Sequence, residues 1–78
     1  MTNLKETLSN IAKAIVDSPE EVVVSETVEG KKVNLVLSVA EHDMGMVIGK
    51  HGKIAKAIRT VMRAAAIADG IDVNVEIR

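Results

Sequence analysis

The segment whose residues could do chemistry is Gly49-Lys50-His51-Gly52, in which two glycines enclose two basic side chains. Glycine tolerates a positive φ and lets the backbone approach a ligand closely. If Gly52 opens a helix, free N–H groups and the positive end of the helix dipole face whatever occupies the loop. Lys53 adds charge at the same point. Together these features fit an anionic group such as a sugar-phosphate backbone, although the bare Gly-x-x-Gly pattern is also typical of an ordinary tight turn.

The distribution of charge supports an anionic ligand more than its total does. The 78 residues carry ten Lys/Arg and eleven Asp/Glu, yet residues 44–68 contain no acidic residue. A local cationic face on a near-neutral protein indicates an anionic partner, and the alternative is a solvated helix face. The basic residues of this window, besides His51, are Lys50, Lys53, Lys56, Arg59 and Arg63.

Other kinds of chemistry find little support in the chain. The absence of cysteine excludes disulfides, thiol nucleophiles and the usual structural zinc site. Neither paired carboxylates nor a Ser-His-acid arrangement is evident, and His42-Asp43 has no third member, so Asp43 is expected to cap a helix or a turn. Residues 45–50 fall one residue short of a P-loop and lack its Ser/Thr. We therefore expect no catalytic residues, no metal, no cofactor and no small-molecule substrate.

The elements that must position the loop follow from periodicity. Apolar residues at Leu4, Leu8, Ile11 and Ile15 predict a helix capped by Asn3, with Glu6 as the reciprocal partner, and Asp17-Ser18-Pro19 ends it. Strands are predicted over 22–28 and 33–39, around a turn at 29–31, and a third strand over 71–78. Between the second and third strands, a short helical segment is predicted over 41–48 and a long helix over 53–69, which Gly70 ends.

These elements make an α+β chain in the order α-β-β-α-α-β. The helices should pack on one face of a three-stranded mixed sheet, because the last strand returns through a helical crossover and lies parallel to the second. The length allows one small domain, 1–78. The polar N-terminus is not a secretory signal, and no apolar run is long enough to span a membrane, so a cytoplasmic protein is expected.

The run Met46-Val47-Ile48-Gly49-Lys50-His51-Gly52-Lys53, followed by Ile58, resembles the signature of KH domains. With the element order, the chain is similar throughout to single type II KH-domain proteins of the bacterial KhpA type. The resemblance implies a groove for about four unpaired RNA nucleotides. It makes Gly49, Lys50, His51 and Gly52 the backbone clamp, places Ile48 beside the base groove, and adds Lys53 and Lys56 to the RNA-binding surface. Many KH domains have a bulky aliphatic residue where this chain has Ala55, which leaves base preference open.

The long helix has a wider apolar arc than one sheet requires. If Ala55, Ile58 and Met62 face the sheet, then Ile54, Val61 and Ala65 lie along an edge that either packs on the first helix or meets a partner. The resemblance favours a homodimer or a KhpB/Jag-like KH-containing partner. It also implies an RNA chaperone or post-transcriptional regulator linked to cell elongation and division. The alternative is a protein-docking module with little RNA affinity.

Overall fold

The computed structural model describes residues 3–78, and residues 1 and 2 lie outside this range. The main elements are α1 (Leu4–Ile15), β1 (Val23–Glu29), β2 (Lys32–Ser38), α2 (Met44–Ile48), α3 (Lys53–Ala68) and β3 (Asp72–Ile77). Short 3-10 turns at Pro19–Glu21, Glu41–Asp43 and Lys50–Gly52 join them. The predicted order α-β-β-α-α-β is therefore confirmed.

The sheet has the strand order β1-β2-β3, with β2 at its centre. β1 and β2 pair antiparallel from Val23↔Ser38 to Glu29↔Lys32, so a two-residue turn joins them. Gly30 in this turn has φ +60°, the left-handed angle that such tight hairpins require. β3 pairs parallel with β2 after the crossover through α2 and α3. The mixed sheet is therefore as predicted.

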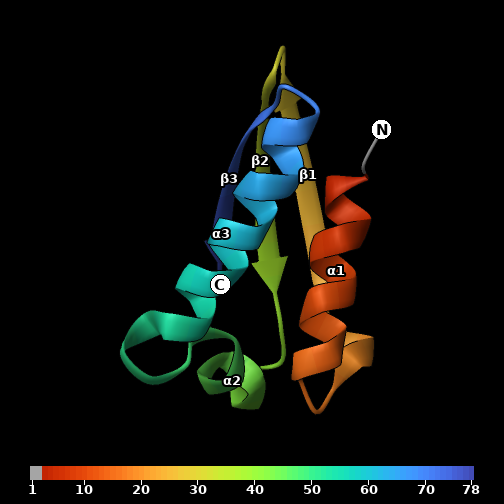
Figure 1. Ribbon diagram of the computed structural model, residues 1–78. Helices are drawn as coiled ribbons and strands as arrows, with labels where there is room; N and C mark the ends of the chain where they lie inside the picture. Colours follow the sequence, from red (N-terminus) through yellow and green to blue (C-terminus); the bar gives the residue numbers. More distant parts are fainter. Residues whose placement is uncertain (1–2) are drawn as a thin grey trace.

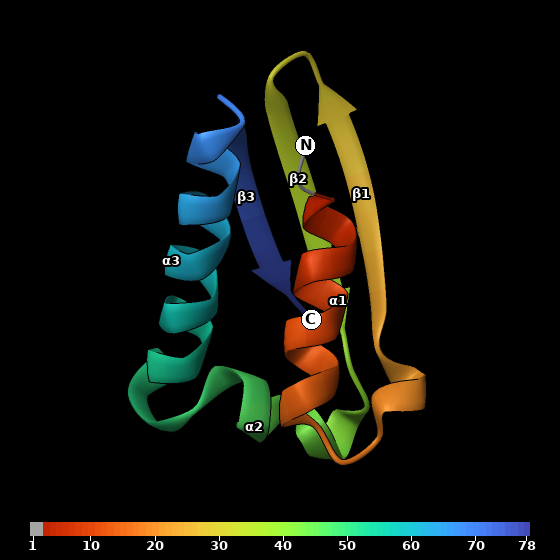
Figure 2. The same ribbon diagram turned by 45° about the vertical axis from the view of Figure 1, so that its right-hand side comes forward.

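The helices form one layer on the sheet (Figures 1 and 2). α1 and α3 lie beside each other across one face, and α2 lies at the end of that face, close to the end of α1. The opposite face of the sheet carries no helix. No helix within residues 3–78 is long and apolar enough to cross a membrane. This two-layer arrangement leaves the turn between α2 and α3 at a corner of the molecule.

The core lies between the helices and the sheet. Alternate residues of β2 point into it, and Leu35 and Leu37 are fully buried. α3 contributes Ile58, Met62 and Ala66, which recur at helical spacing. The remaining buried members of this cluster are Leu4, Leu8, Ala12, Val24, Val33, Val73 and Val75. Of the stripe predicted for α3, Ile58 and Met62 therefore face the sheet, and Ala55 is buried outside this cluster.

The first helix is fixed at both ends by local sequence. The Asn3 side chain accepts a hydrogen bond of 3.0 Å from the Glu6 backbone N–H, which is the Asn3 half of the predicted cap. The helix stops at Ile15, before Pro19. The first strand begins one residue later than predicted, because the Val22 N–H donates to the Pro19 carbonyl (3.2 Å) and so belongs to the 3-10 turn.

Candidate functional site

The glycine-bounded segment joins α2 to α3 through an uncommon run of backbone angles. Gly49 has φ 74°, His51 has φ 59° and Gly52 has φ 71°. Residues 50–52 form one short 3-10 turn that leads directly into α3. Non-glycine residues rarely adopt positive φ, but His is among the types that do so most readily. These angles therefore give the loop one particular backbone conformation.

Two N–H groups at the end of this loop donate to carbonyl groups within it. The Gly52 N–H donates to the Gly49 carbonyl (3.1 Å), and the Lys53 N–H donates to the Lys50 carbonyl. The expectation of free N–H groups at the start of the long helix is therefore only partly right, because the 3-10 turn uses two of them. Neither bond uses the N–H groups of Lys50 and His51, which stand between the two glycines.

The two glycines of the loop are required for different reasons. A Cβ at Gly49 would collide with Ile54 Cγ1 and would lie 2.9 Å from Ile54 Cβ. A Cβ at Gly52 would meet nothing within 4 Å, so only its positive φ favours glycine there. Gly49 thus packs the start of the loop against the first turn of α3. This contact gives Ile54 a supporting role that the sequence did not indicate.

Gly49→Ala is expected to destabilise the protein more than Gly30→Ala. Gly30 has a similar φ of +60° but open space around it, so alanine there adds only left-handed strain, about 1–2 kcal/mol. At Gly49 the clash with Ile54 adds about 1–3 kcal/mol of overpacking. Urea unfolding of both variants measures the difference. Equal losses would contradict the close packing of Gly49 on Ile54.

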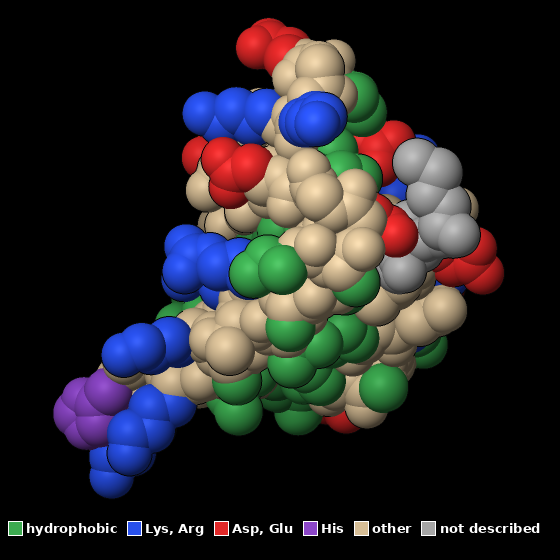
Figure 3. Space-filling model, turned by 45° about the horizontal axis from the view of Figure 1, so that its top comes forward, with side chains coloured by type: hydrophobic (Ala, Val, Ile, Leu, Met, Phe, Trp, Pro, Cys, Tyr) green, Lys and Arg blue, Asp and Glu red, His purple; other side chains and the backbone are tan. Residues whose placement is uncertain are grey.

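Positive charge gathers around this loop. The side chains of Lys50, His51, Lys53 and Lys56 are all exposed. In Figure 3 Lys/Arg and His side chains project together at one end of the visible face, and the acidic side chains on that face lie elsewhere. The loop at residues 49–52 and these cations therefore face the same region of solvent.

The basic surface continues along one flank of α3. Arg59 is half-buried, and its Nε–H donates to the Val75 carbonyl (3.2 Å) on β3, an edge strand of the sheet. Arg63, one turn further along, is exposed. At about 100° per residue Lys56 falls on this flank as well. The cationic side of α3 therefore lies toward β3.

The residues expected to form an interface lie on the other flank of α3. Ile54 is 39% exposed and Val61 is 52% exposed, so α1 does not bury them. Ala65 is half-buried and packs against the core. Packing on α1 is the alternative that the sequence left open. It accounts for the burial of Ala65 better than for the positions of Ile54 and Val61, which stay exposed. Whether a partner covers this flank stays a prediction.

The residues expected beside the base groove are placed differently from one another. Ile48, the last residue of α2, is 38% exposed next to Gly49. Ala55 is buried, on the same side of α3 as Ile58. Ala55 therefore belongs to the packing beneath α3, and Ile54 is the residue of that pair which contacts the loop.

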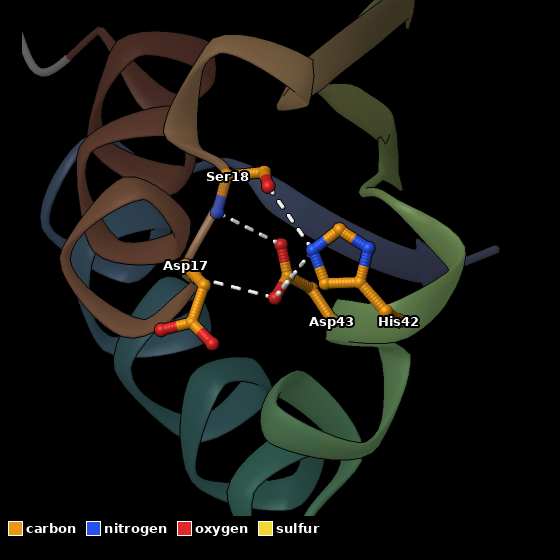
Figure 4. A network of polar contacts seen from close by, with 4 residues as sticks. All are labelled: Asp17, Ser18, His42 and Asp43. Carbon is orange, nitrogen blue, oxygen red and sulfur yellow. Dashed lines mark hydrogen bonds and ion pairs between the residues drawn. The ribbon is translucent and has the colours of Figure 1, made fainter.

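Sequence reasoning missed the polar cluster in Figure 4, which joins the end of α1 to the start of α2. The Asp43 side chain is fully buried, and its carboxylate oxygens accept the backbone N–H groups of Asp17 (3.2 Å) and Ser18 (3.0 Å). Asp43 does not cap its own helix. The expected capping of a turn is confirmed, but the turn lies about 25 residues away in the chain.

The same cluster corrects the expectation that no Ser-His-acid set exists. His42 Nε2 lies 3.0 Å from Ser18 Oγ and 3.6 Å from Asp43 Oδ1. A nucleophilic relay needs the serine on one ring nitrogen and the acid on the other. Here both contacts involve Nε2, and the carboxylate is already occupied by two backbone N–H groups. The three residues therefore form a structural cluster without the geometry of a catalytic triad.

Comparison with known proteins identifies the family. The model of the KhpA/KhpB KH domain matches residues 5–77. The chain belongs to this KH-domain family. It is 54% identical over 74 residues to the RNA-binding protein KhpA of Clostridium acetobutylicum, covering 95% of this chain and 99% of the relative. The corresponding protein of Listeria monocytogenes serovar 1/2a is 40% identical over 74 residues, covering 95% and 97%.

The family assignment agrees with the fold. The resemblance drawn from residues 46–53 is confirmed, as is the α+β fold class with its three-stranded mixed sheet. No solved structure matches the chain significantly. The family model and the curated relatives therefore carry the assignment, and the roles of individual loop residues stay predictions.

Proposed function

We propose that this chain is a non-catalytic protein that grips single-stranded RNA through the loop at residues 49–52. The observation that carries the proposal is the glycine-bounded loop at residues 49–52, with left-handed angles at His51 and Gly52, beside exposed basic side chains. The name RNA-binding protein KhpA, borne by relatives 40–54% identical to the chain, supports it. In this account the clamp is Gly49, Lys50, His51 and Gly52, with Lys53 and Lys56 extending it along α3.

The chemistry of the surface sets the character of this binding. The chain contains no Phe, Trp or Tyr, so it has no aromatic platform on which bases could stack. Recognition then rests on sugar-phosphate contacts and on aliphatic packing of bases beside Ile48. With about 3–4 phosphates neutralised, affinity should be modest and strongly dependent on salt. Sequence preference should be weak.

A second copy would raise the useful affinity. Two linked domains on one RNA convert the second binding step into an intramolecular one. We place the contact on the flank of α3 formed by Ile54, Val61 and Ala65, either with a second copy or with a KhpB/Jag-like KH-containing protein. Weak, paired binding of this kind suits an RNA chaperone or post-transcriptional regulator in the cytoplasm, with a family link to cell elongation and division.

One observation favours a second candidate function, a protein-docking module with little RNA affinity. Val61 is 52% exposed on the flank of α3 opposite the basic residues. A helix face of this kind is a common docking surface for another helix. In this alternative the loop at 49–52 is only a turn between two helices.

A fluorescence-anisotropy titration separates the two functions. Labelled single-stranded RNA oligomers are titrated at 50 and 200 mM salt, with a duplex of the same sequence as the control for shape. The RNA-binding proposal expects binding to the single strand that weakens about 20- to 50-fold between these salt concentrations, as 3–4 phosphate contacts require. Absence of binding at low salt would favour the docking module.

A further inference from the structure

Asp43 connects two parts of the chain that the sheet does not hold together. Each of its carboxylate oxygens accepts one backbone N–H, from Asp17 and from Ser18, in the turn that follows α1. Its own residue immediately precedes α2. Hydrogen bonds to an ionised acceptor are about twice as strong as neutral ones. The carboxylate therefore ties the end of α1 to the beginning of α2.

A buried carboxylate generally stabilises a protein no better than an apolar side chain of similar volume. Removing a charge from water is unfavourable, and replacing buried ionic groups with apolar ones of similar volume is often neutral or stabilising. What directed hydrogen bonds add is a fixed relative position of the two parts they join. Asp43 fits this use, because its two oxygens leave neither N–H group of the turn unpaired.

The position of Asp43 is transmitted to the loop by a short rigid element. α2 has only five residues, of which Val47 alone is buried. The Gly49 N–H donates to the Gly45 carbonyl (2.9 Å), so helical bonding continues from α2 into the first residue of the loop. On the other side Gly49 meets Ile54. The loop is thus held by α3 at one side, and by Val47 and Asp43 through α2 at the other.

We propose that Asp43 is a positioning residue for the loop at 49–52, which rests on the RNA-binding function proposed above. By anchoring α2 to the turn at residues 17–18, it holds the N–H groups of Lys50 and His51 in register with the basic side chains around them. His42 supports this anchor from the solvent side through Ser18 Oγ. Its side chain is mostly exposed, so its contribution is the smaller one.

Asp43→Asn tests the proposal, because it keeps the shape of the side chain but turns one acceptor into a donor that faces a backbone N–H. We expect Kd for single-stranded RNA to rise about tenfold and the slope of log K against log salt to fall by about 0.7, since a displaced loop loses a phosphate contact. His42→Ala should change both values less. Val33→Ala, a core control at the far end of β2, should lower stability and leave the salt slope unchanged.

A second variant covers the case in which Asp43→Asn does not fold. Asp17→Pro removes one of the two donors and leaves the carboxylate in place; the preceding Val16 is extended (ψ 160°), as a residue before proline must be. It should change Kd and salt slope in the same direction. An unchanged salt slope in the folded variants would overturn the positioning role.

Amide hydrogen exchange decides the proposal without RNA, so its failure is distinct from failure of the proposed function. In Asp43→Asn the hydrogen-bonded amides of Gly49, Gly52 and Lys53 should exchange at least tenfold faster, while those of β2 change little. Equal acceleration in β2, or no acceleration in the loop, would overturn the proposal. If the native protein bound no RNA, faster loop exchange would still support the anchor.

Discussion

The double variant Lys50→Asp/His51→Asp is expected to lose single-stranded RNA binding while keeping its fold. Both side chains are exposed, so the fold does not depend on them. Asp is among the residues that tolerate positive φ, so position 51 gains little strain. Acidic side chains beside the RNA backbone place like charges together, which costs about 3 kcal/mol, more than a hundredfold in Kd. Anisotropy titration measures the loss, and circular dichroism checks the fold.

A matched control separates a local clamp from a general charge effect. Lys5→Asp/Asn10→Asp changes the net charge by the same amount on exposed positions of α1. It should weaken RNA binding only slightly, because charges farther away than about 10 Å are largely screened at 0.1 M salt. Similar losses in the two double variants would contradict the assignment of the clamp to residues 50 and 51.

Val61→Asp is expected to abolish the proposed self-association and leave a folded monomer. The Val61 side chain is half in solvent, so an aspartate there can remain hydrated in the monomer. In an interface the same carboxylate would be buried without a partner. An increase of more than a hundredfold in the dimer dissociation constant is expected, about 3 kcal/mol. Size-exclusion chromatography with light scattering reads the mass directly.

Ile67→Asp is the control for this prediction. Ile67 is 74% exposed on the solvent side of the same helix, so the chemical change is similar but the flank differs. The Ile67 variant should keep the mass of the native protein. A Val61→Asp variant with unchanged mass would move the contact away from this flank, and an unfolded one would show that Val61 contributes to the fold.

Local sequence signals predicted most of the fold, because the forces that set these elements act over a few residues. Asn3 capping Glu6, Gly30 in the hairpin and Gly70 after α3, with φ +69°, all lie where the pattern placed them. The alternation of Val33, Leu35 and Leu37 gave the buried face of β2. The parallel pairing of β3 followed from the crossover rule.

What the sequence did not reveal depends on contacts between distant residues. The Asp43 carboxylate finds its donors 25 and 26 positions away, so no local pattern could distinguish it from an ordinary helix cap. The hydrogen bond from Arg59 to the Val75 carbonyl spans 16 residues. Predicting it requires the position of β3 relative to α3. Such partners follow only from the packed arrangement of the elements.

The candidate site likewise combines features that the local sequence predicts with features that depend on the packing of the elements. The glycine spacing and the neighbouring lysines predicted a loop for an anionic ligand, which needs only the order of residues. The fit of Gly49 against Ile54 and the internal bonds of the 3-10 turn depend on the angle between α2 and α3. The sequence could therefore name the loop residues but could not say which N–H groups the turn itself uses.

The most direct test of the central claim is a titration of the isotopically labelled protein with a short single-stranded RNA, followed by amide NMR. The account predicts that the largest shift changes fall on the amides of Lys50, His51, Gly52, Lys53 and Lys56, and that the uncovered sheet face changes little. Changes centred on α1 or on that sheet face, with the loop unaffected, would contradict it.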